Sequence, residues 1–276
     1  MEDGKLNFEI NFHLVGDASR ADDAVSVRYG TEGSYKVLII EGGTDDSAED
    51  VVRHVKSLYG DHTIVSDVIS THPDSDHACG LREILRELPV ERLWAHGLWH
   101  HAAEIIDLFE DSRWSVQGLA DAIKVQYPAI AELFELAAQE GIPICEPFTG
   151  TRIGPFTVLS PSKTIYQHLI PQFRKTPTPN VDLLKERRIW LGENANPGIL
   201  TRLPQGTTAT KRAIVSAPKD DAKHPRKMVL NAFLRRGAPE RSTQGNLYRY
   251  YPGIGLRPGM KPAEVFGFFD KVKAYD

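Results

Sequence analysis

Four side chains that can bind a metal ion or transfer a proton occur within six residues of this chain. They are the two imidazoles and two carboxylates of the segment HPDSDH, namely His72, Asp74, Asp76 and His77. Imidazole nitrogens and carboxylate oxygens together suit Zn²⁺, Mn²⁺ or Fe²⁺. The spacing H-x-D-x-D-H therefore predicts a metal-binding loop. The structural alternative is a polar turn in which Asp76 caps the following helix.

The sequence on either side places this segment between a strand and a helix. Residues 63–70 (TIVSDVIS) are short and mostly apolar, which predicts a strand. From about Cys79 to Leu88, apolar residues recur at helical spacing. A loop between two such elements lets alternate side chains converge on one point.

Three strands and a helix are expected before the loop. Residues 6–14 alternate between apolar and polar side chains, which predicts a strand whose polar face, with Glu9, Asn11 and His13, is exposed to water. The segments AVSVRY and YKVLII, joined by GTEG, predict a hairpin. A helix follows, and Ser47 is its expected N-cap.

The rest of the chain combines helices with shorter strands. In order, we expect a strand at 90–95, a helical insertion at 99–141, a strand at 156–160, a loop at 161–212, a strand at 213–217, a helix at 224–236 and a strand at 246–251. Hairpins combined with strand–helix units favour an α/β fold with a mixed sheet covered by helices.

The loop resembles the signature loop of the metallo-β-lactamase superfamily, H-x-H-x-D-H. It is most similar to the cytoplasmic domain of competence DNA-uptake proteins (ComEC-like), which carry S/T-H-P-D-A/S-D-H before a small residue and Gly, where this chain has THPDSDHACGL. The sequences DDA at 22–24, IEGG at 40–43 and LSP at 159–161 resemble further elements of that group. Residues 216–237 resemble its last strand and the helix that follows.

This resemblance assigns a role to each residue of the loop. His72 and Asp74 match the positions that hold a first metal ion, and Asp76 and His77 match those that hold a second. Asp76 would also orient the nucleophile, which makes it the candidate catalytic residue. Because Asp74 stands where most of the superfamily has His, Mn²⁺ and Mg²⁺ join Zn²⁺, the favoured ion, as candidate cofactors.

Two elements of the family are missing from the sequence, a strand that ends in Asp and a late His-containing loop. In the expected loop 161–212, no apolar strand ends in Asp and His168 is the one histidine. The resemblance thus implies a metallo-β-lactamase-like αββα sandwich, a single domain over residues 1–276 with the insertion 99–141 and a second half truncated near 180–195. The alternative is a rearrangement in which another group supplies the missing ligands.

The activity implied by the resemblance is metal-dependent hydrolysis of phosphodiester bonds by a metal-activated water, as in a nuclease or phosphodiesterase. The expected partners are small-molecule or nucleic-acid substrates. Because the late ligands are missing, the alternative is a catalytically impaired or inactive descendant that serves as a binding or regulatory module.

Several other polar residues have both functional and structural interpretations. His96, His100 and His101 follow a predicted strand and could approach the metal loop, with His96 the best candidate, or form a surface cluster. His224 could line the cleft or orient a loop. For Glu41, which follows a predicted buried strand, we expect a structural hydrogen-bonding role.

The composition fits a globular protein in a reducing compartment. The chain has 276 residues, of which 41% are hydrophobic, enough to bury a core. A net charge of −4 excludes a global attraction to nucleic acid or anionic membranes. Two cysteines are too few for a disulfide framework, and neither a signal peptide nor a membrane span is evident, so we expect a cytoplasmic protein without a membrane partner.

Overall fold

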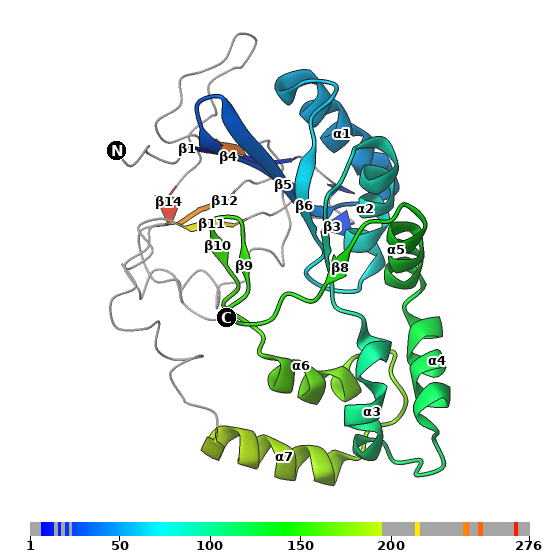
Figure 1. Ribbon diagram of the computed structural model, residues 1–276. Helices are drawn as coiled ribbons and strands as arrows, with labels where there is room; N and C mark the ends of the chain where they lie inside the picture. The colour runs from blue at the N-terminus through cyan, green and yellow to red at the C-terminus, as the bar shows by residue number, and fades with distance from the viewer. Residues whose placement is uncertain are drawn as a thin grey trace.

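The computed structural model describes residues 7–13, 16–17, 20–21, 24–194, 213–215, 240–242, 248–250 and 268–269. In this part of the chain a seven-stranded sheet has the order β13-β1-β4-β5-β6-β7-β8 (Figure 1). Its strands are β13 (Tyr248–Tyr250), β1 (Asn7–Phe12), β4 (Ala24–Thr31), β5 (Ser34–Gly42), β6 (Val65–Ile69), β7 (Leu93–Trp94) and β8 (Ile144–Cys145).

The sheet is mixed, as the sequence predicted. From β13 to β5 each strand runs antiparallel to its neighbour, and from β5 to β8 the strands are parallel. Because parallel strands end at the same edge, the residues that follow β5, β6, β7 and β8 gather there. This edge carries the chemistry described below.

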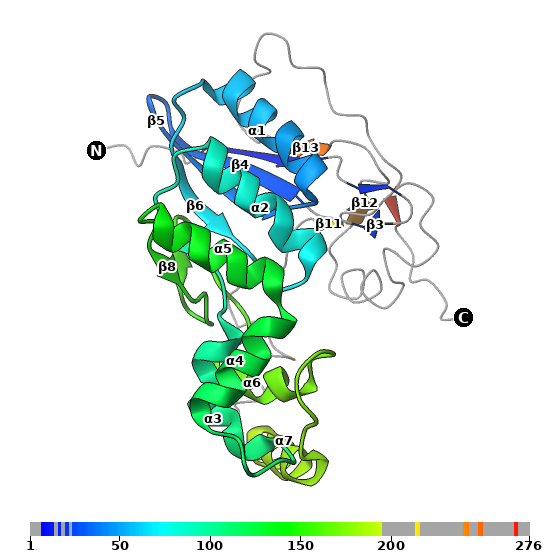
Figure 2. The ribbon, with the colours of Figure 1, turned by 90° about the vertical axis from the view of Figure 1, so that its right-hand side faces the viewer.

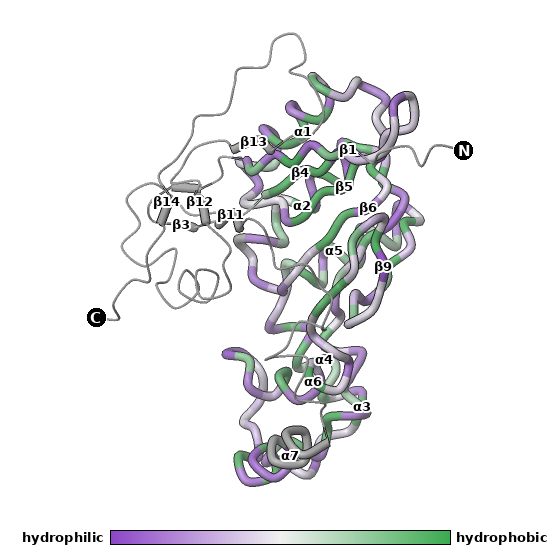
Figure 3. The backbone as a smooth tube through the Cα atoms, turned by 90° about the vertical axis from the view of Figure 1, so that its left-hand side faces the viewer, coloured by the Kyte–Doolittle hydropathy of each residue, from purple (hydrophilic) through white to green (hydrophobic). Residues whose placement is uncertain are grey.

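Three helices cover one face of this sheet: α1 (Asp45–Tyr59), α2 (Ser75–Glu87) and α5 (Pro128–Gln139) (Figure 2). Their apolar residues recur at helical spacing and pack on central strands that are hydrophobic along most of their length (Figure 3). Ile39 of β5, Leu81 of α2 and Leu133 of α5 are each fully buried in this core. The core therefore fixes the position of α2, which follows the metal loop, against β5.

The remaining described helices form a lobe beyond one end of the sheet (Figures 1 and 2). They are η1 (Leu98–His101), α3 (Ala102–Ile105), η2 (Ile106–Leu108), α4 (Val116–Gln126), α6 (Lys163–Leu169), η3 (Ile170–Gln172) and α7 (Val181–Asn194), with each η a short 3₁₀ helix. No helix in the described ranges has both the length and the apolar character needed to cross a bilayer.

The expectation of a loop over 161–212 was wrong for its first part, where α6, η3 and α7 lie. The Ser162 side chain caps α6 by accepting a hydrogen bond from the N–H of Ile165 (3.3 Å). Tyr166, Ile170 and Leu184 are buried against the other helices of the lobe. Proline suits the first turn of a helix as well as a loop, so its frequency here did not exclude helices.

The polar face of β1 is buried, whereas the alternation had predicted that it faces water. Glu9 is 1% exposed and Asn11 0% exposed. Helix α1 covers them, and the Asn11 amide donates a hydrogen bond to the Tyr59 hydroxyl (2.7 Å), which itself lies 3.3 Å from a Glu9 oxygen. His13 pairs with the Ser26 hydroxyl (2.9 Å). Mutual hydrogen bonding makes this burial tolerable.

Two expected helix caps were also placed wrongly. Helix α1 starts at Asp45, and the Thr44 hydroxyl accepts a hydrogen bond from the Ser47 N–H (3.4 Å), so Thr44 is the N-cap. Helix α2 has Asp74 at its N-cap position, without a side-chain cap bond, in place of Asp76.

Other strands are shorter than the sequence suggested or lie apart from the main sheet. Strand β10 (Phe156–Thr157) pairs with β9 (Arg152–Ile153), and β2 (Gly16–Asp17) with β3 (Arg20–Ala21). Strands β11 (Ala213–Val215), β12 (Glu240–Ser242) and β14 (Phe268–Phe269) form a separate three-stranded sheet. The helix expected at 224–236, with His224, lies outside the described residues.

The backbone of α2 touches the backbone at the end of β5. The Gly80 N–H donates a hydrogen bond to the Gly43 carbonyl (3.0 Å). A Cβ atom on Gly80 would overlap the Gly42 carbonyl, and one on Gly42 would overlap the backbone of Gly80 and Leu81. Only glycine permits this approach, which fixes the end of β5 relative to the first turns of α2.

Replacing Gly80 with Ala is expected to lower the free energy of unfolding by about 1–3 kcal/mol, because the added methyl group meets rigid backbone. Urea unfolding measures the change. Gly118→Ala in α4 is the matched control, because its added carbon would meet side chains and not backbone, namely the Ser115 hydroxyl at 3.0 Å and the Trp114 ring at 3.6 Å, and alanine favours the helix. Equal stability of the two variants would contradict the contact.

Candidate metal centre

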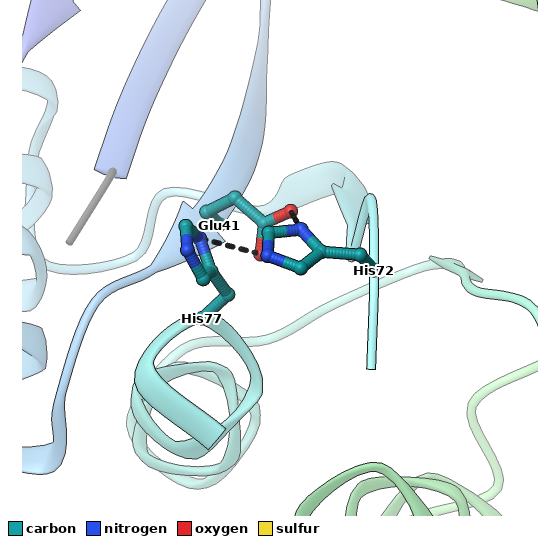
Figure 4. A group of neighbouring side chains, drawn as sticks. All are labelled: Glu41, His72 and His77. Atoms are coloured by element: carbon teal, nitrogen blue, oxygen red, sulfur yellow. Dashed lines mark ion pairs between the residues drawn. The ribbon is translucent and has the colours of Figure 1, made fainter. Parts of the chain in front are cut away.

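Three side chains from three different elements converge at the edge where the parallel strands end (Figure 4). Glu41 is the penultimate residue of β5, His72 lies in the loop after β6, and His77 is in the first turn of α2. Ile40 of β5 pairs with Ile69 of β6, so Glu41 and the loop leave the sheet side by side. The fold thus joins a strand end to both ends of the HPDSDH segment.

The three side chains are close enough to share one ion. One ligand atom from each residue lies within 4.8 Å of the other two. His72 Nδ1 is 3.9 Å from Glu41 Oε1, and His77 Nδ1 is 3.9 Å from Glu41 Oε2. The side chains of Glu41 and His77 are 4% and 12% exposed, and that of His72 is 41% exposed. The group is therefore enclosed on the protein side and open to solvent beside His72.

Backbone and hydroxyl groups hold this arrangement in place. Glu41 Oε1 accepts a hydrogen bond from the Thr71 N–H (2.5 Å), and the Thr71 hydroxyl lies 2.9 Å from His72 Nδ1. The Ser70 hydroxyl donates to the carbonyl of His72 (3.2 Å). Glu41 has a φ of 57°, a left-handed conformation that is uncommon for a residue with a side chain and is often found at functional sites.

The donor set fits a divalent cation. Two imidazoles and one carboxylate are the ligands of many catalytic zinc sites and of Fe²⁺ oxygenases, which leave further positions open for substrate. Bond lengths near 2.0–2.1 Å in a tetrahedral site place ligand atoms about 3.4 Å apart. Side-chain rotations would bring the ligand atoms of Glu41, His72 and His77, which lie within 4.8 Å of one another, to that distance.

The structure brings together two of the four residues that the loop spacing singled out, His72 and His77. Asp74 is exposed at the N-cap position of α2 and is not part of the group. Asp76 lies in the first turn of α2, and its side chain is outside the described part of the structure. Glu41 makes the structural hydrogen bond expected of it and also faces both histidines, a role that the sequence analysis missed. The sequence feature that could have indicated this role is the position of Glu41 at the end of β5, the strand that precedes β6 and the HPDSDH segment.

A second row of polar side chains continues along the same edge after β7 and β8. His101 Nε2 is 2.9 Å from Glu146 Oε1, which also accepts a hydrogen bond from the Gly97 N–H (3.2 Å). His96 Nδ1 lies 3.7 Å from the same oxygen, and its ring stacks on Tyr166 with centroids 4.3 Å apart. This row is a packed polar cluster against the helical lobe.

Among the described residues, the other histidines considered as possible ligands lie outside the three-residue group and differ in their surroundings. His96 lines a cavity of about 40 Å³ together with His72, but it does not belong to the three-residue group. His101 is 2% exposed, so it is not part of a surface cluster, whereas His100 is exposed. His168 is buried in α6 and is also outside the group.

Glu146 is the most strongly perturbed carboxylate of this row. Burial by itself raises its pKa, but the hydrogen bond with His101, the nearby His96 imidazole and the charges of both rings outweigh burial and lower the pKa to about 2. Its value in the unfolded chain is near 4.5. A lowered pKa in the folded state contributes stability above pH 4.5, and this contribution is lost as the pH falls toward 2.

Glu146→Gln is therefore expected to cost about 2–3 kcal/mol of stability at pH 7, and the cost should shrink between pH 5 and pH 2. Urea unfolding of both proteins at pH 7 and at pH 3 gives the two differences. Glu140→Gln, at an exposed position, is the control and should change little at either pH. A Glu146→Gln cost that is the same at both pH values would argue against the ionised pairing.

Part of this chain is similar to a known family. Residues 30–159 match the model of the metallo-beta-lactamase superfamily. The matched part contains Glu41, His72 and His77. No curated protein matches the chain.

Solved structures of metallo-beta-lactamases are also similar to this chain. One, a subclass B3 enzyme isolated from a soil metagenome library, has 18% identity and a TM-score of 0.29 over 53% of this chain and 50% of its own. Another, a mutant enzyme from Cronobacter sakazakii, has 22% identity and a TM-score of 0.23 over 32% of this chain and 34% of its own. The matched region thus spans half or less of either structure.

Glu41→Gln is expected to lower zinc affinity by at least about tenfold, because the amide keeps an acceptor for the Thr71 N–H but loses the negative charge. Titration of metal-free protein against a chromogenic zinc chelator measures the affinity. Asp74→Asn is the matched control, since Asp74 is exposed and outside the group. A loss on Asp74→Asn but not on Glu41→Gln would instead favour the ligand set that the loop spacing predicted.

Proposed function

We propose that this chain is a metal-dependent hydrolase of phosphodiester bonds, with a small-molecule or nucleic-acid substrate. The observation that carries the proposal is the convergence of Glu41, His72 and His77 at the carboxyl edge of the parallel strands, within the superfamily region. In open α/β sheets this edge is where ligands bind.

A cleft gives substrate access to this group. It has a volume of about 550 Å³ and is lined on one side by His72, Pro73, Asp74 and Ser75. That volume lies in the usual range for small-molecule sites. His72 belongs both to the cleft and to the metal group, so a substrate in the cleft would meet the exposed side of the centre.

Different residues would bind the cation and transfer protons. Glu41, His72 and His77 would hold the ion. When bound, a divalent cation polarises a substrate oxygen and makes a water molecule more acidic. Zn²⁺ suits two imidazoles and a carboxylate, and Mn²⁺ or Mg²⁺ are alternatives if the carboxylates of Asp74 and Asp76 also contribute.

Asp76 remains the proposed catalytic residue. It lies one position before His77 in the first turn of α2, which keeps it near the centre. As a carboxylate near the ion it would orient the attacking water and accept its proton. Asp74, exposed in the cleft lining, is proposed as a group that faces the substrate, and a ligand role for it is the alternative that the loop spacing predicted.

Two features support a phosphodiester substrate. The loop resembles that of competence DNA-uptake proteins, and the cleft wall opposite the loop carries the cations Arg174 and Lys175. The alternative, a binding or regulatory module without turnover, predicts the same fold but no metal-dependent cleavage.

His72→Ala and Asp76→Ala are each expected to reduce Zn²⁺- or Mn²⁺-dependent cleavage of bis(p-nitrophenyl) phosphate by at least about 10²-fold, since one change removes a ligand and the other a proton acceptor. Release of p-nitrophenol gives the rate. His62→Ala, an exposed imidazole outside the group, is the control, and circular dichroism checks folding. Unchanged cleavage in both test variants would show that the loop is not the site.

Elemental analysis of the purified protein separates the enzyme from the module. At least one equivalent of metal per chain, with activity lost on chelation and restored by Zn²⁺ or Mn²⁺, supports the hydrolase. A metal content near zero, with no cleavage after metal addition, supports the module.

A further inference from the structure

The wall of the cleft that faces the metal loop is a tight turn from the helical lobe. Phe173, Arg174 and Lys175 line the cleft, and Thr176 closes the turn behind them. The Thr176 hydroxyl donates to the carbonyl of Phe173 (2.8 Å) and lies 3.1 Å from that of Pro171, and the Thr176 N–H also donates to Phe173 (3.2 Å). These bonds hold Arg174 and Lys175 at the tip of the turn.

Tyr127, at the junction of α4 and α5, contacts the turn at Lys175. Its side chain is buried, and burial raises the pKa of its hydroxyl, while a hydrogen bond with the backbone of Lys175 acts in the opposite direction. The charge of Asp74 raises the pKa further, which places Asp74 near the same ring. Lys175 Nζ lies 6.0 Å from the ring centroid. Tyr127 therefore links the cationic turn to the loop across the cleft.

The two cations are adjacent, exposed and not neutralised. Within the described ranges, no carboxylate lies within 4.0 Å of Arg174 or Lys175. By contrast, Arg82 pairs with both Asp45 and Glu132. Among the side chains of the cleft lining that the structure describes, Asp74 is the one carboxylate, so the two cations outnumber it. Like charges held side by side favour binding of an anion.

We propose that Arg174 and Lys175 form a subsite for a second phosphate group of the substrate, next to the phosphodiester at the metal centre. This inference rests on the proposed function and narrows its substrate to a nucleotide that carries a neighbouring phosphate. The guanidinium of Arg174 can bind two phosphate oxygens at once, and Lys175 adds a mobile point charge. The single phosphodiester would contact the centre beside His72, while the neighbouring phosphate would contact the turn.

A pair of substrates that differ only in the second phosphate tests the subsite on the metal-loaded protein. They are thymidine 5′-(p-nitrophenyl phosphate) and its 3′-phosphorylated form, which release the same leaving group. We expect the wild-type protein to favour the 3′-phosphorylated form by about tenfold in kcat/KM, as one well-formed charged contact would give. In the Arg174→Ala/Lys175→Ala variant the preference should vanish, so that both substrates are cleaved with the same kcat/KM.

Two controls identify the cause of such a change. Lys36→Ala removes an exposed cation that does not line the cleft and should keep the preference. Added KCl should weaken the preference in the wild-type protein, because salt screens exposed charges. An equal preference in the wild-type protein and the double variant would overturn the subsite, even if both cleave the diester.

If neither substrate is cleaved, equilibrium binding of two thymidine phosphates tests the subsite. Thymidine 3′,5′-bisphosphate should bind the metal-loaded wild-type protein about tenfold more tightly than thymidine 5′-monophosphate, and the double variant should bind both alike. Such a result without any cleavage would reject the proposed hydrolase and leave the subsite standing. No difference between the two ligands in the wild-type protein would reject the subsite.

Discussion

The contact between the backbone of Gly80 in α2 and that of Gly42 and Gly43 after β5 determines the geometry of the candidate centre. Glu41 precedes this contact on the strand, and His77 lies one helical turn before it on the helix. Any side chain at Gly42 or Gly80 would push these elements apart, and the Glu41 carboxylate would move away from the imidazole of His77. The chemistry at the edge of the sheet therefore depends on two positions without side chains.

The polar residues at this edge follow the order of the parallel strands. Glu41 is the penultimate residue of β5, His72 follows β6, His96 follows β7 and Glu146 follows β8. The first two, with His77, form the open group, whereas the last two pair with each other and with His101. The His72 side chain is 41% exposed, whereas that of His96 is only 8% exposed. The first group is therefore open to solvent beside His72, and the second is packed against the helical lobe.

Local sequence patterns predicted the helices and strands better than the side-chain contacts between them. The H-x-D-x-D-H spacing located the chemistry because strand, loop and helix are consecutive in the chain. Glu41 was missed as a candidate ligand because its position beside the loop depends on the register between β5 and β6, which local periodicity does not encode. The buried polar face of β1 was misjudged for a similar reason, because Tyr59 of α1 reaches Glu9 and Asn11 from far along the chain. Buried polar residues that hydrogen-bond with one another give the same alternation of apolar and polar residues as a strand with one exposed face.

The charge of the centre connects its ligand set to its substrate. Glu41 with two neutral imidazoles would leave a divalent cation with a net charge of about +1, and Arg174 and Lys175 across the cleft add to that positive potential. If Asp74 and Asp76 also bound a single ion, the same centre would carry a net charge of about −1 and would repel a phosphodiester. A centre held by Glu41, His72 and His77 alone would thus suit the proposed anionic substrate better. Glu41 belongs to the sheet, whereas the cationic turn belongs to the helical lobe, so under this proposal the lobe would set substrate preference without altering the group that would bind the metal.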